Sequence, residues 1–304
     1  MLEFDTSAGV EEEQGLERNI KMKFTKMHGA GNDFVIIDDR SMNFPEHDTA
    51  RVQKISARGT GVGCEGVILV RLADAFTECD FKMIFLNPDG SRASMCGNAS
   101  RCLALFAFEK GIGGRHQRIG TDAGIISADV LDFHEGQGVV CVHMTEPKDR
   151  VPLVTVDLPQ GRSVECFKVD TGVPHAVVFV DDVAAMDVNR DGKIIRFAQV
   201  FAPQGVNVDF VQIIESGPSL MRTYERGVEA ESGACGTGAV AAGLAMAEKL
   251  GLSLPVSLRV TSGDVLVVDG QVAESGLCHS MTLTGPACKV FEGHFNASWL
   301  ETTP

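Results

Sequence analysis

Two short stretches place a cysteine, a glycine and a polar residue directly before an apolar, alanine-rich run. The first is M-C-G-N-A-S-R-C at 95–102 and the second is A-C-G-T-G-A at 234–239. A helix start carries unsatisfied N–H groups and about half a positive charge, so a thiol placed there is expected to ionise more easily. The same N–H groups bind carboxylates. Cys96 and Cys235 are therefore the predicted reactive groups.

Two such thiols, one from each half of the chain, match the needs of inversion at the α-carbon of an amino acid. That reaction requires a base on one face and an acid on the other, and a thiolate and a thiol can fill both roles without a cofactor. Asn98 and Thr237 add polar side chains to the first helical turns. Either cysteine alone could be an ordinary buried thiol beside a turn, but the repetition favours a function. Cys102, further along the first apolar run, is assigned to the core.

The elements around the two cysteines repeat along the chain. Each half has several short strands and one apolar helix, expected at 98–110 and at 237–249. The expected strands flank a Gly loop within 22–38 and then lie at 64–71, 80–86, 125–131, 138–144, 164–169, 175–180, 208–214, 219–224, 256–261, 264–268, 280–284 and 288–291. This internal repeat predicts an α+β fold of two related domains.

Composition narrows the class of function. The chain has 304 residues and a net charge of -14, which argues against a nucleic acid or an anionic membrane as partner. No apolar run approaches the roughly 18 residues of a membrane span. The acidic residues 1–20 do not resemble a secretory signal and are expected to be a mobile extension. Nine cysteines without a C-x-x-C motif favour reduced thiols and a cytoplasmic location. The scattered His and Cys residues predict no metal site.

Several further stretches resemble the diaminopimelate epimerase family, in the order in which that family has them. They are K-M-H-G-A-G-N-D-F-V (26–35), F-L-N-P-D-G-S (85–91), M-C-G-N-A-S-R-C (95–102), T-G-V-P-H (171–175), G-V-N-V-D-F-V (205–211), R-T-Y-E-R-G (222–227) and A-C-G-T-G-A (234–239). The resemblance covers about residues 22–292. It implies an epimerase, independent of pyridoxal phosphate or any other cofactor, that interconverts LL- and meso-diaminopimelate for lysine and peptidoglycan precursor synthesis.

The resemblance also implies an architecture. It predicts two pseudo-symmetric domains, each a strongly curved, mostly antiparallel sheet wrapped around a central helix. After the extension at 1–20, residues 21–144 and 286–304 would form the domain that carries Cys96, and residues 145–285 the domain that carries Cys235. The family further suggests a homodimer.

The resemblance assigns roles to individual residues. Cys96 and Cys235 become the two-base pair, and His175 and Glu225 become catalytic residues that set the protonation of the thiols. The implied substrate contacts are Asn32, Asn87, Gly97, Asn98, Asn207, Glu225, Arg226, Gly236 and Thr237. From the residues alone, Arg226 suits a bidentate grip on the distal carboxylate. His175 could equally be a core histidine, Glu225 could simply pair with Arg226, and Asn32 could serve turn geometry.

Two departures from the family pattern bear on specificity. Many members have Asn where this chain has Val173, which removes one amide contact to the substrate. The segment between Arg226 and Cys235 is one residue longer than the shortest version expected in the family. Either Glu229 or Glu231 could therefore fill the role of the family's acidic residue there, with Glu231 preferred. His28 is assigned a structural role.

Other functions are weaker fits. G-T-G-V-G-C at 59–64 lacks the third Gly of a dinucleotide-binding loop, and D-V-N-R-D-G at 187–192 lacks the final Glu of an EF-hand. A cofactor-independent racemase of another amino acid remains an alternative because of Val173. A thiol redox protein is less favoured, since it would not need Arg226 or the asparagines. A binding module is least favoured, because binding alone does not require paired thiols.

Overall fold

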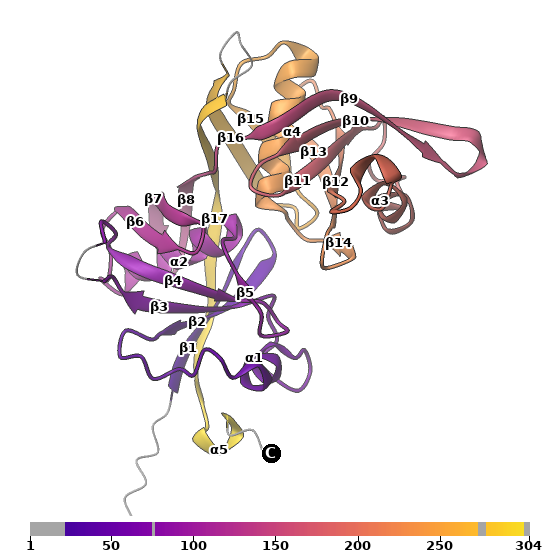
Figure 1. The fold of residues 1–304 in the computed structure, drawn as a ribbon. Helices are drawn as coiled ribbons and strands as arrows, with labels where there is room; N and C mark the ends of the chain where they lie inside the picture. Colours follow the sequence, from indigo (N-terminus) through magenta and orange to yellow (C-terminus); the bar gives the residue numbers. More distant parts are fainter. Residues whose placement is uncertain (1–21, 75–76, 273–277, 301–304) are drawn as a thin grey trace, which may run out of the picture.

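The computed structural model describes residues 22–74, 77–272 and 278–300, so the predicted acidic extension lies outside the described residues. Two lobes lie side by side, and each wraps strands around one central helix (Figure 1). The fold is therefore the predicted α+β arrangement in two parts. Within the described residues, no helix has both the length and the apolar character needed to cross a membrane.

The first lobe surrounds α2 (Gly97–Glu109), in which every residue from 97 to 107 is buried. A shorter helix, α1 (Thr49–Ser56), lies between the second and third strands. The strands are β1 (Met22–Gly29), β2 (Asn32–Asp38), β3 (Val67–Leu72), β4 (Phe81–Leu86), β5 (Arg92–Ala93), β6 (His116–Thr121), β7 (Gly124–His134) and β8 (Gln137–His143).

The second lobe surrounds α4 (Gly236–Leu250), which ends at Gly251 in the left-handed conformation and contains the helix expected at 237–249. Its other helices are α3 (Val188–Arg196) and two short 3₁₀ turns, η1 (Pro159–Gly161) and η2 (Gln199–Phe201). The strands are β9 (Lys148–Leu158), β10 (Arg162–Asp170), β11 (Pro174–Phe179), β12 (Asn207–Gln212), β13 (Ser219–Glu225), β14 (Ala230–Ser232), β15 (Val256–Arg259) and β16 (Val265–Val272).

The strand pairing repeats from one lobe to the other. The antiparallel pairs β1–β2, β3–β4 and β6–β7 recur as β10–β11, β12–β13 and β15–β16. The parallel pairs β2–β3 and β4–β6 recur as β11–β12 and β13–β15. In both lobes a very short strand directly precedes the central helix in the sequence: β5 precedes α2, and β14 precedes α4. This equivalence puts the two cysteine-glycine turns in matching places.

The two strands expected at 280–284 and 288–291 are one 18-residue strand, β17 (Cys278–Phe295), followed by α5 (Ala297–Leu300). It runs through both lobes (Figure 1). Pro286 lies within this strand, although proline cannot donate to a sheet ladder. The strand can continue because it changes partner here. Its pairing with β16 extends as far as Thr284, and its pairing with β1 starts at Cys288. Between these points β8 is the only described strand that pairs with β17, so the other edge needs no donor. The predicted domain boundary at 285/286 falls within this strand.

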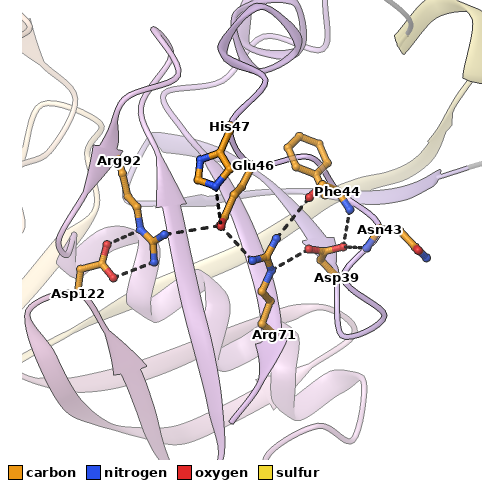
Figure 2. Close-up of polar contacts among 8 residues, drawn as sticks. All are labelled: Asp39, Asn43, Phe44, Glu46, His47, Arg71, Arg92 and Asp122. Carbon is orange, nitrogen blue, oxygen red and sulfur yellow. Dashed lines mark hydrogen bonds and ion pairs between the residues drawn. The ribbon is translucent and has the colours of Figure 1, made fainter. Parts of the chain in front are cut away.

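A network of charged groups connects β5, the short strand before α2, to its surroundings (Figure 2). The buried Arg71 of β3 donates from Nε to Asp39 Oδ2 at 2.9 Å and from Nη1 to Glu46 Oε2 at 3.1 Å. Glu46 also pairs with Arg92 of β5, whose guanidinium binds Asp122 on the far side. The network ties β3, the loop after β2 and the turn after β6 to β5, the short strand that leads into the central helix.

Candidate active site

The two predicted cysteines occupy equivalent positions at the starts of the two central helices. Cys96 is the N-cap of α2 (φ −145°, ψ 124°) and Cys235 is the N-cap of α4 (φ −115°, ψ 114°). Both are free thiols; Cys235 is buried and Cys96 is partly buried. Cys235 Sγ accepts a hydrogen bond from the N–H of Gly238 at 3.4 Å. Each thiol thus lies at the positive end of a helix dipole.

The two helix starts meet at the junction of the lobes. Asn98 Nδ2 donates across the junction to the carbonyl of Ala234 at 2.9 Å. A Cβ atom added to Gly236 would lie 3.0 Å from Leu283 and 3.7 Å from the Cα of Gly97. Glycine at this position therefore permits the close approach of the two turns. The structure therefore brings together the two helix starts that contain Gly97, Asn98, Gly236 and Thr237.

Burial decides the acidity of both thiols. Burial raises the pKa of Cys96, and the charge of Glu225 raises it further. The backbone N–H of Ala99 lowers this pKa and offsets part of the effect. Burial also raises the pKa of Cys235 well above its ordinary value, and the charges of Glu225 and Asp209 add to the effect. The expectation that the helix starts make these thiols easier to ionise is wrong for the free protein, because desolvation outweighs the helix end. Both side chains are protonated near neutral pH.

A hydrogen-bonded chain leads from Cys235 into the core of the second lobe. Thr237 Oγ1 lies 3.4 Å from Cys235 Sγ and 2.9 Å from His175 Nε2. His175 Nδ1 lies 2.7 Å from Asp209 Oδ2, and both residues are fully buried. Thr223 donates to the other oxygen of Asp209 at 2.8 Å. The carboxylate thus holds the proton on Nδ1 and leaves Nε2 as an acceptor facing the threonine hydroxyl.

Asp209 was not among the residues predicted from sequence. It lies in β12, where V-N-V-D-F-V places one acid within an apolar strand. A carboxylate in a fully buried strand needs a partner, so this pattern was the available signal. Nothing in the sequence specified that the partner would be His175, because the pairing depends on the parallel register of β11 with β12.

Gly238 leaves room for this buried pair. A Cβ atom at Gly238 would lie 2.4 Å from Asp209 Oδ1 and 3.0 Å from Met221. Gly238→Ala should therefore displace Asp209 and lower the free energy of unfolding by about 1–3 kcal/mol. Denaturant titration measures the loss. Gly114→Ala is the matched control, because its added Cβ would meet nothing closer than 3.7 Å. Unchanged stability in Gly238→Ala would contradict the proposed crowding.

Glu225 is a carboxyl group close to both thiols. Burial raises the pKa of Glu225, and the hydroxyl of Ser232 partly offsets this effect. Its charge raises the pKa of Cys96 and of Cys235 alike. A single carboxyl group therefore influences both halves of the site.

Some of the predicted substrate contacts form hydrogen bonds within the protein, and others have polar atoms without such a bond. Asn207 Oδ1 accepts from the backbone N–H of Arg226 at 2.7 Å, and its Nδ2 donates to Pro174 at 3.3 Å. Asn87 donates to Ser91 at 3.0 Å. Asn32 Oδ1, although buried, has no hydrogen-bond partner in the described part of the chain.

The guanidinium of Arg226 makes no hydrogen bond or ion pair with any described residue. Glu229 and Glu231, the alternative acids of the neighbouring segment, are both engaged. Glu231 binds Arg222 through two hydrogen bonds of 2.6 and 2.8 Å. Glu229 pairs with Arg196 and accepts from Tyr224. Arg226 is thus the charged side chain of this segment that is available to a ligand.

Three other residues singled out in the sequence have local roles. The carbonyl of Val173 accepts from the N–H of Thr171 at 3.1 Å, in the turn before β11. His28 Nδ1 accepts from the N–H of Gly31 at 3.3 Å within the β1–β2 turn, which fits its structural assignment. Cys102 is fully buried in the core.

Comparison with known proteins decides the family. A sequence model described as "Diaminopimelate epimerase" matches residues 24–149 and 167–290. The diaminopimelate epimerase of Aquifex aeolicus is 43% identical over 289 residues, which cover 92% of this chain and 100% of that protein. That of Hydrogenobaculum sp. is 40% identical, over 90% of this chain and 98% of its own length. The chain belongs to the diaminopimelate epimerase family.

Solved structures of other proteins share the fold of this diaminopimelate epimerase family member. A probable proline racemase from Agrobacterium radiobacter superimposes with a TM-score of 0.67 at 18% identity, covering 93% of this chain and 96% of that one. A hydroxyproline epimerase from Agrobacterium vitis superimposes with a TM-score of 0.68 at 16% identity, covering 91% and 93%. The likeness confirms the predicted fold.

Proposed function

We propose that this chain interconverts LL- and meso-diaminopimelate without a cofactor, by proton transfer between Cys96 and Cys235. The observation that carries the proposal is the meeting of two thiol-capped helix starts beside one carboxyl group. Family membership supplies the substrate, and the geometry supports the chemistry. The activity serves the synthesis of lysine and of peptidoglycan precursors.

The α-carboxylate of the substrate would be held where the two helix starts meet. Backbone N–H groups of Gly97, Asn98, Gly236 and Thr237 lie in the first turns of α2 and α4. Such groups bind anions and carry the positive ends of two helix dipoles. They would stabilise the negative charge that spreads from the α-carbon onto the carboxylate during proton removal. The helix ends therefore serve both binding and catalysis.

The proton transfer conserves charge. The thiolate of one cysteine takes the proton from the α-carbon, so that an S–H bond forms and the C–H electron pair stays on carbon. The opposite thiol then gives its proton to the other face, and its sulfur becomes the thiolate. The enzyme thus ends one turnover with the two protonation states exchanged. The reverse reaction uses the same groups in opposite roles.

One thiol must lose its proton before the first step, and buried groups nearby can accept it. Glu225 is favoured as the acceptor because burial raises the pKa of its carboxyl group towards that of a useful base. On the α4 side, His175 reaches Cys235 through the hydroxyl of Thr237. Both residues keep the catalytic roles that the family resemblance implies.

Arg226 is proposed to bind the distal carboxylate, with Asn32, Asn87 and Asn207 as further contacts. Removing the guanidinium in Arg226→Met should raise KM by about 10²-fold or more, because a charge-assisted bidentate contact is lost. Arg226→Lys should recover only part of the affinity, since lysine cannot bind both oxygens in one plane. Steady-state kinetics with diaminopimelate measure both variants. An unchanged KM in Arg226→Met would assign the distal group to another site.

The reaction itself is tested with reduced protein and LL-diaminopimelate in deuterated water. Proton NMR follows the α-proton, and chiral chromatography follows the stereoisomers. Deuterium incorporation with formation of the meso isomer supports the proposal. Exchange with another amino acid but not with diaminopimelate would leave the chemistry in place and overturn the substrate, an outcome that Val173 makes worth testing. No exchange with any amino acid would overturn the two-thiol mechanism.

We infer two properties of the enzyme in the cell. A cytoplasmic location agrees with an odd number of cysteines, nine, without a C-x-x-C motif and with a role in amino-acid biosynthesis. A homodimer follows from the family resemblance, and light scattering of the purified protein measures it. A monomer at working concentration would overturn the second inference.

A further inference from the structure

The tip of the hairpin between β1 and β2 lies directly before a proposed substrate contact. Gly29 pairs with Asn32 across this hairpin, so Ala30 and Gly31 form the two-residue β1–β2 tip. Both tip residues have positive φ angles, 55° for Ala30 and 84° for Gly31, as a type I′ turn requires. Ala30 is fully buried, which anchors the tip in its own lobe. Because Asn32 follows the tip without a spacer, the position of the tip determines where Asn32 lies.

The β1–β2 tip belongs to the first lobe but contacts the second. A Cβ atom added to Gly31 would lie 2.7 Å from the Cβ of Ser262, and its next neighbours would be Oγ and Cα of the same serine. A Cβ atom added to Gly233 would lie 3.7 Å from the carbonyl carbon of Gly31 and 4.0 Å from the carbonyl oxygen of Ala30. Glycine at position 31 therefore allows the tip to pack directly on the side chain of Ser262.

Ser262 is held in place by hydrogen bonds within the second lobe. It lies in the turn between β15 and β16, and its hydroxyl donates to Asp264 Oδ2 at 3.0 Å. Its backbone N–H donates to the carbonyl of Gly233 at 3.2 Å. Gly233 lies two residues before Cys235, the N-cap of α4. Ser262 is thus fixed relative to the start of α4, and its hydroxyl is already occupied.

These contacts join a proposed substrate contact of the first lobe to the catalytic thiol of the second. The amide oxygen of Asn32 is buried without a hydrogen-bond partner among the described residues, so no bond of its own holds it in place. The packing of the tip on Ser262 supplies that support instead. Both Gly31 and Ser262 are exposed, so a substitution at this contact changes the junction of the lobes without opening the core.

We propose that Ser262 is a positioning residue for the epimerisation, because its Cβ supports the β1–β2 tip and holds Asn32 at a fixed distance from Cys235. The inference rests on the proposed two-thiol function. A substrate bound by Asn32 and by the helix starts needs both lobes in register, and a displacement of about 1 Å can lower a rate by about 10²-fold. Ser262 acts through the tip and touches neither the substrate nor the reacting carbon.

Moving one Cβ atom across the contact tests the proposal. Gly31→Ala should crowd Ser262, displace Asn32 and raise KM for diaminopimelate by about tenfold, with a smaller effect on kcat. Ser262→Gly removes the support and should raise KM by about threefold. In the double variant the added methyl group fills the space that the serine side chain leaves, since the nearest remaining atom is the Cα of residue 262 at 3.9 Å. Its KM should return to within about threefold of the unmodified value.

Gly59→Ala is the matched control for backbone strain. Gly59 has a φ of 87°, close to that of Gly31, and a Cβ atom added there would meet nothing within 4 Å. The control should lose stability through the same unfavourable backbone conformation and keep its KM. A rise in KM equal to that of Gly31→Ala would assign the effect to strain and overturn the proposal.

Asn32→Ala tests whether the contact acts through Asn32. In the Asn32→Ala background, Gly31→Ala should change KM by less than about twofold, because the side chain that it displaces is gone. The same tenfold rise in both backgrounds would overturn the proposal. If Gly31→Ala alone does not fold, Ser262→Gly decides, because an unchanged KM in that variant would also overturn it.

Denaturant midpoints of the two single variants and the double variant need no substrate. Non-additive midpoints in a protein that epimerises no amino acid would uphold the contact between the lobes and reject the proposed function. Additive midpoints, with Gly31→Ala epimerising at the unmodified rate, would overturn the role of Ser262 and leave the proposed function standing.

Discussion

Replacing either Cys96 or Cys235 with alanine should lower the epimerisation rate by about 10³-fold or more. Each thiol supplies one of the two proton transfers, and a positioned acid or base contributes roughly 10²–10⁴-fold. The first turns of both helices should survive, because cysteine caps α2 without a side-chain hydrogen bond and α4 with only a weak one. Chiral chromatography of the product measures the loss in both directions of the reaction.

Exchange and inversion should separate in these variants. A variant with one remaining thiol can remove and return a proton on one face only, so it should incorporate deuterium into at most one stereoisomer and invert neither. Cys141→Ala is the control, since this partly buried thiol of β8 lies outside the site and should leave turnover unchanged. Inversion by either single variant at near the unmodified rate would show that another group acts as the second base.

The pH dependence of turnover follows from the same two thiols. A raised pKa keeps a thiol protonated near neutral pH, so the thiolate fraction grows as pH rises. The value of kcat/KM should therefore increase with pH into the alkaline range, and fall again once both thiols are ionised and no acid remains. An acidic limb that lies below the ordinary range of a cysteine would indicate that Glu225, whose pKa is raised by burial, is the group being titrated rather than a thiol.

The sequence was most informative where chemistry and local structure coincide. The cysteine-glycine turns, the apolar helices after them and Gly251 as a helix end are set by neighbouring residues, and the structure has them in place. The local sequence patterns did not predict α1 and α3, which are two short helices with polar faces. Asp48 and Asp187 cap them by accepting from Arg51 and Arg190. The stretch at 187–192, compared with a calcium loop, is in fact the capped start of α3.

Features that depend on register between distant strands could not be obtained from local pattern. The continuity of β17 through Pro286 depends on where β16 stops and β1 begins, which no neighbouring residue reveals. The pKa of each thiol was given the wrong direction because a helix start is visible in the sequence, whereas the desolvation around it is not. The surroundings of the buried Arg101 likewise depend on distant strands, because Gly29 of β1 and Gly285 of β17 lie against its guanidinium.

The second large effect is expected from Asp209→Asn, which keeps the shape of the buried side chain and removes its charge. An asparagine amide would donate to His175 Nδ1, so the imidazole proton would move to Nε2 and face Thr237 as a donor. The chain from the histidine to Cys235 would lose its acceptor, and kcat should fall by about 10²-fold or more. Loss of a charge-assisted buried contact should also lower the free energy of unfolding by about 2–4 kcal/mol.

Asp209→Asn should make the Cys235 thiol more acidic although it lowers kcat. The charge of Asp209 raises the pKa of this thiol, so Asp209→Asn should lower that pKa, and alkylation of Cys235 should begin at lower pH. Asp129→Asn is the matched control, because Asp129 pairs with His116 at 2.8 Å on the surface and should affect neither stability nor turnover much. A thiol that ionises more easily in an enzyme that turns over more slowly would show that the buried pair directs the proton rather than merely holding the fold. Slower turnover with an unchanged Cys235 titration would mean that Asp209 acts through stability alone.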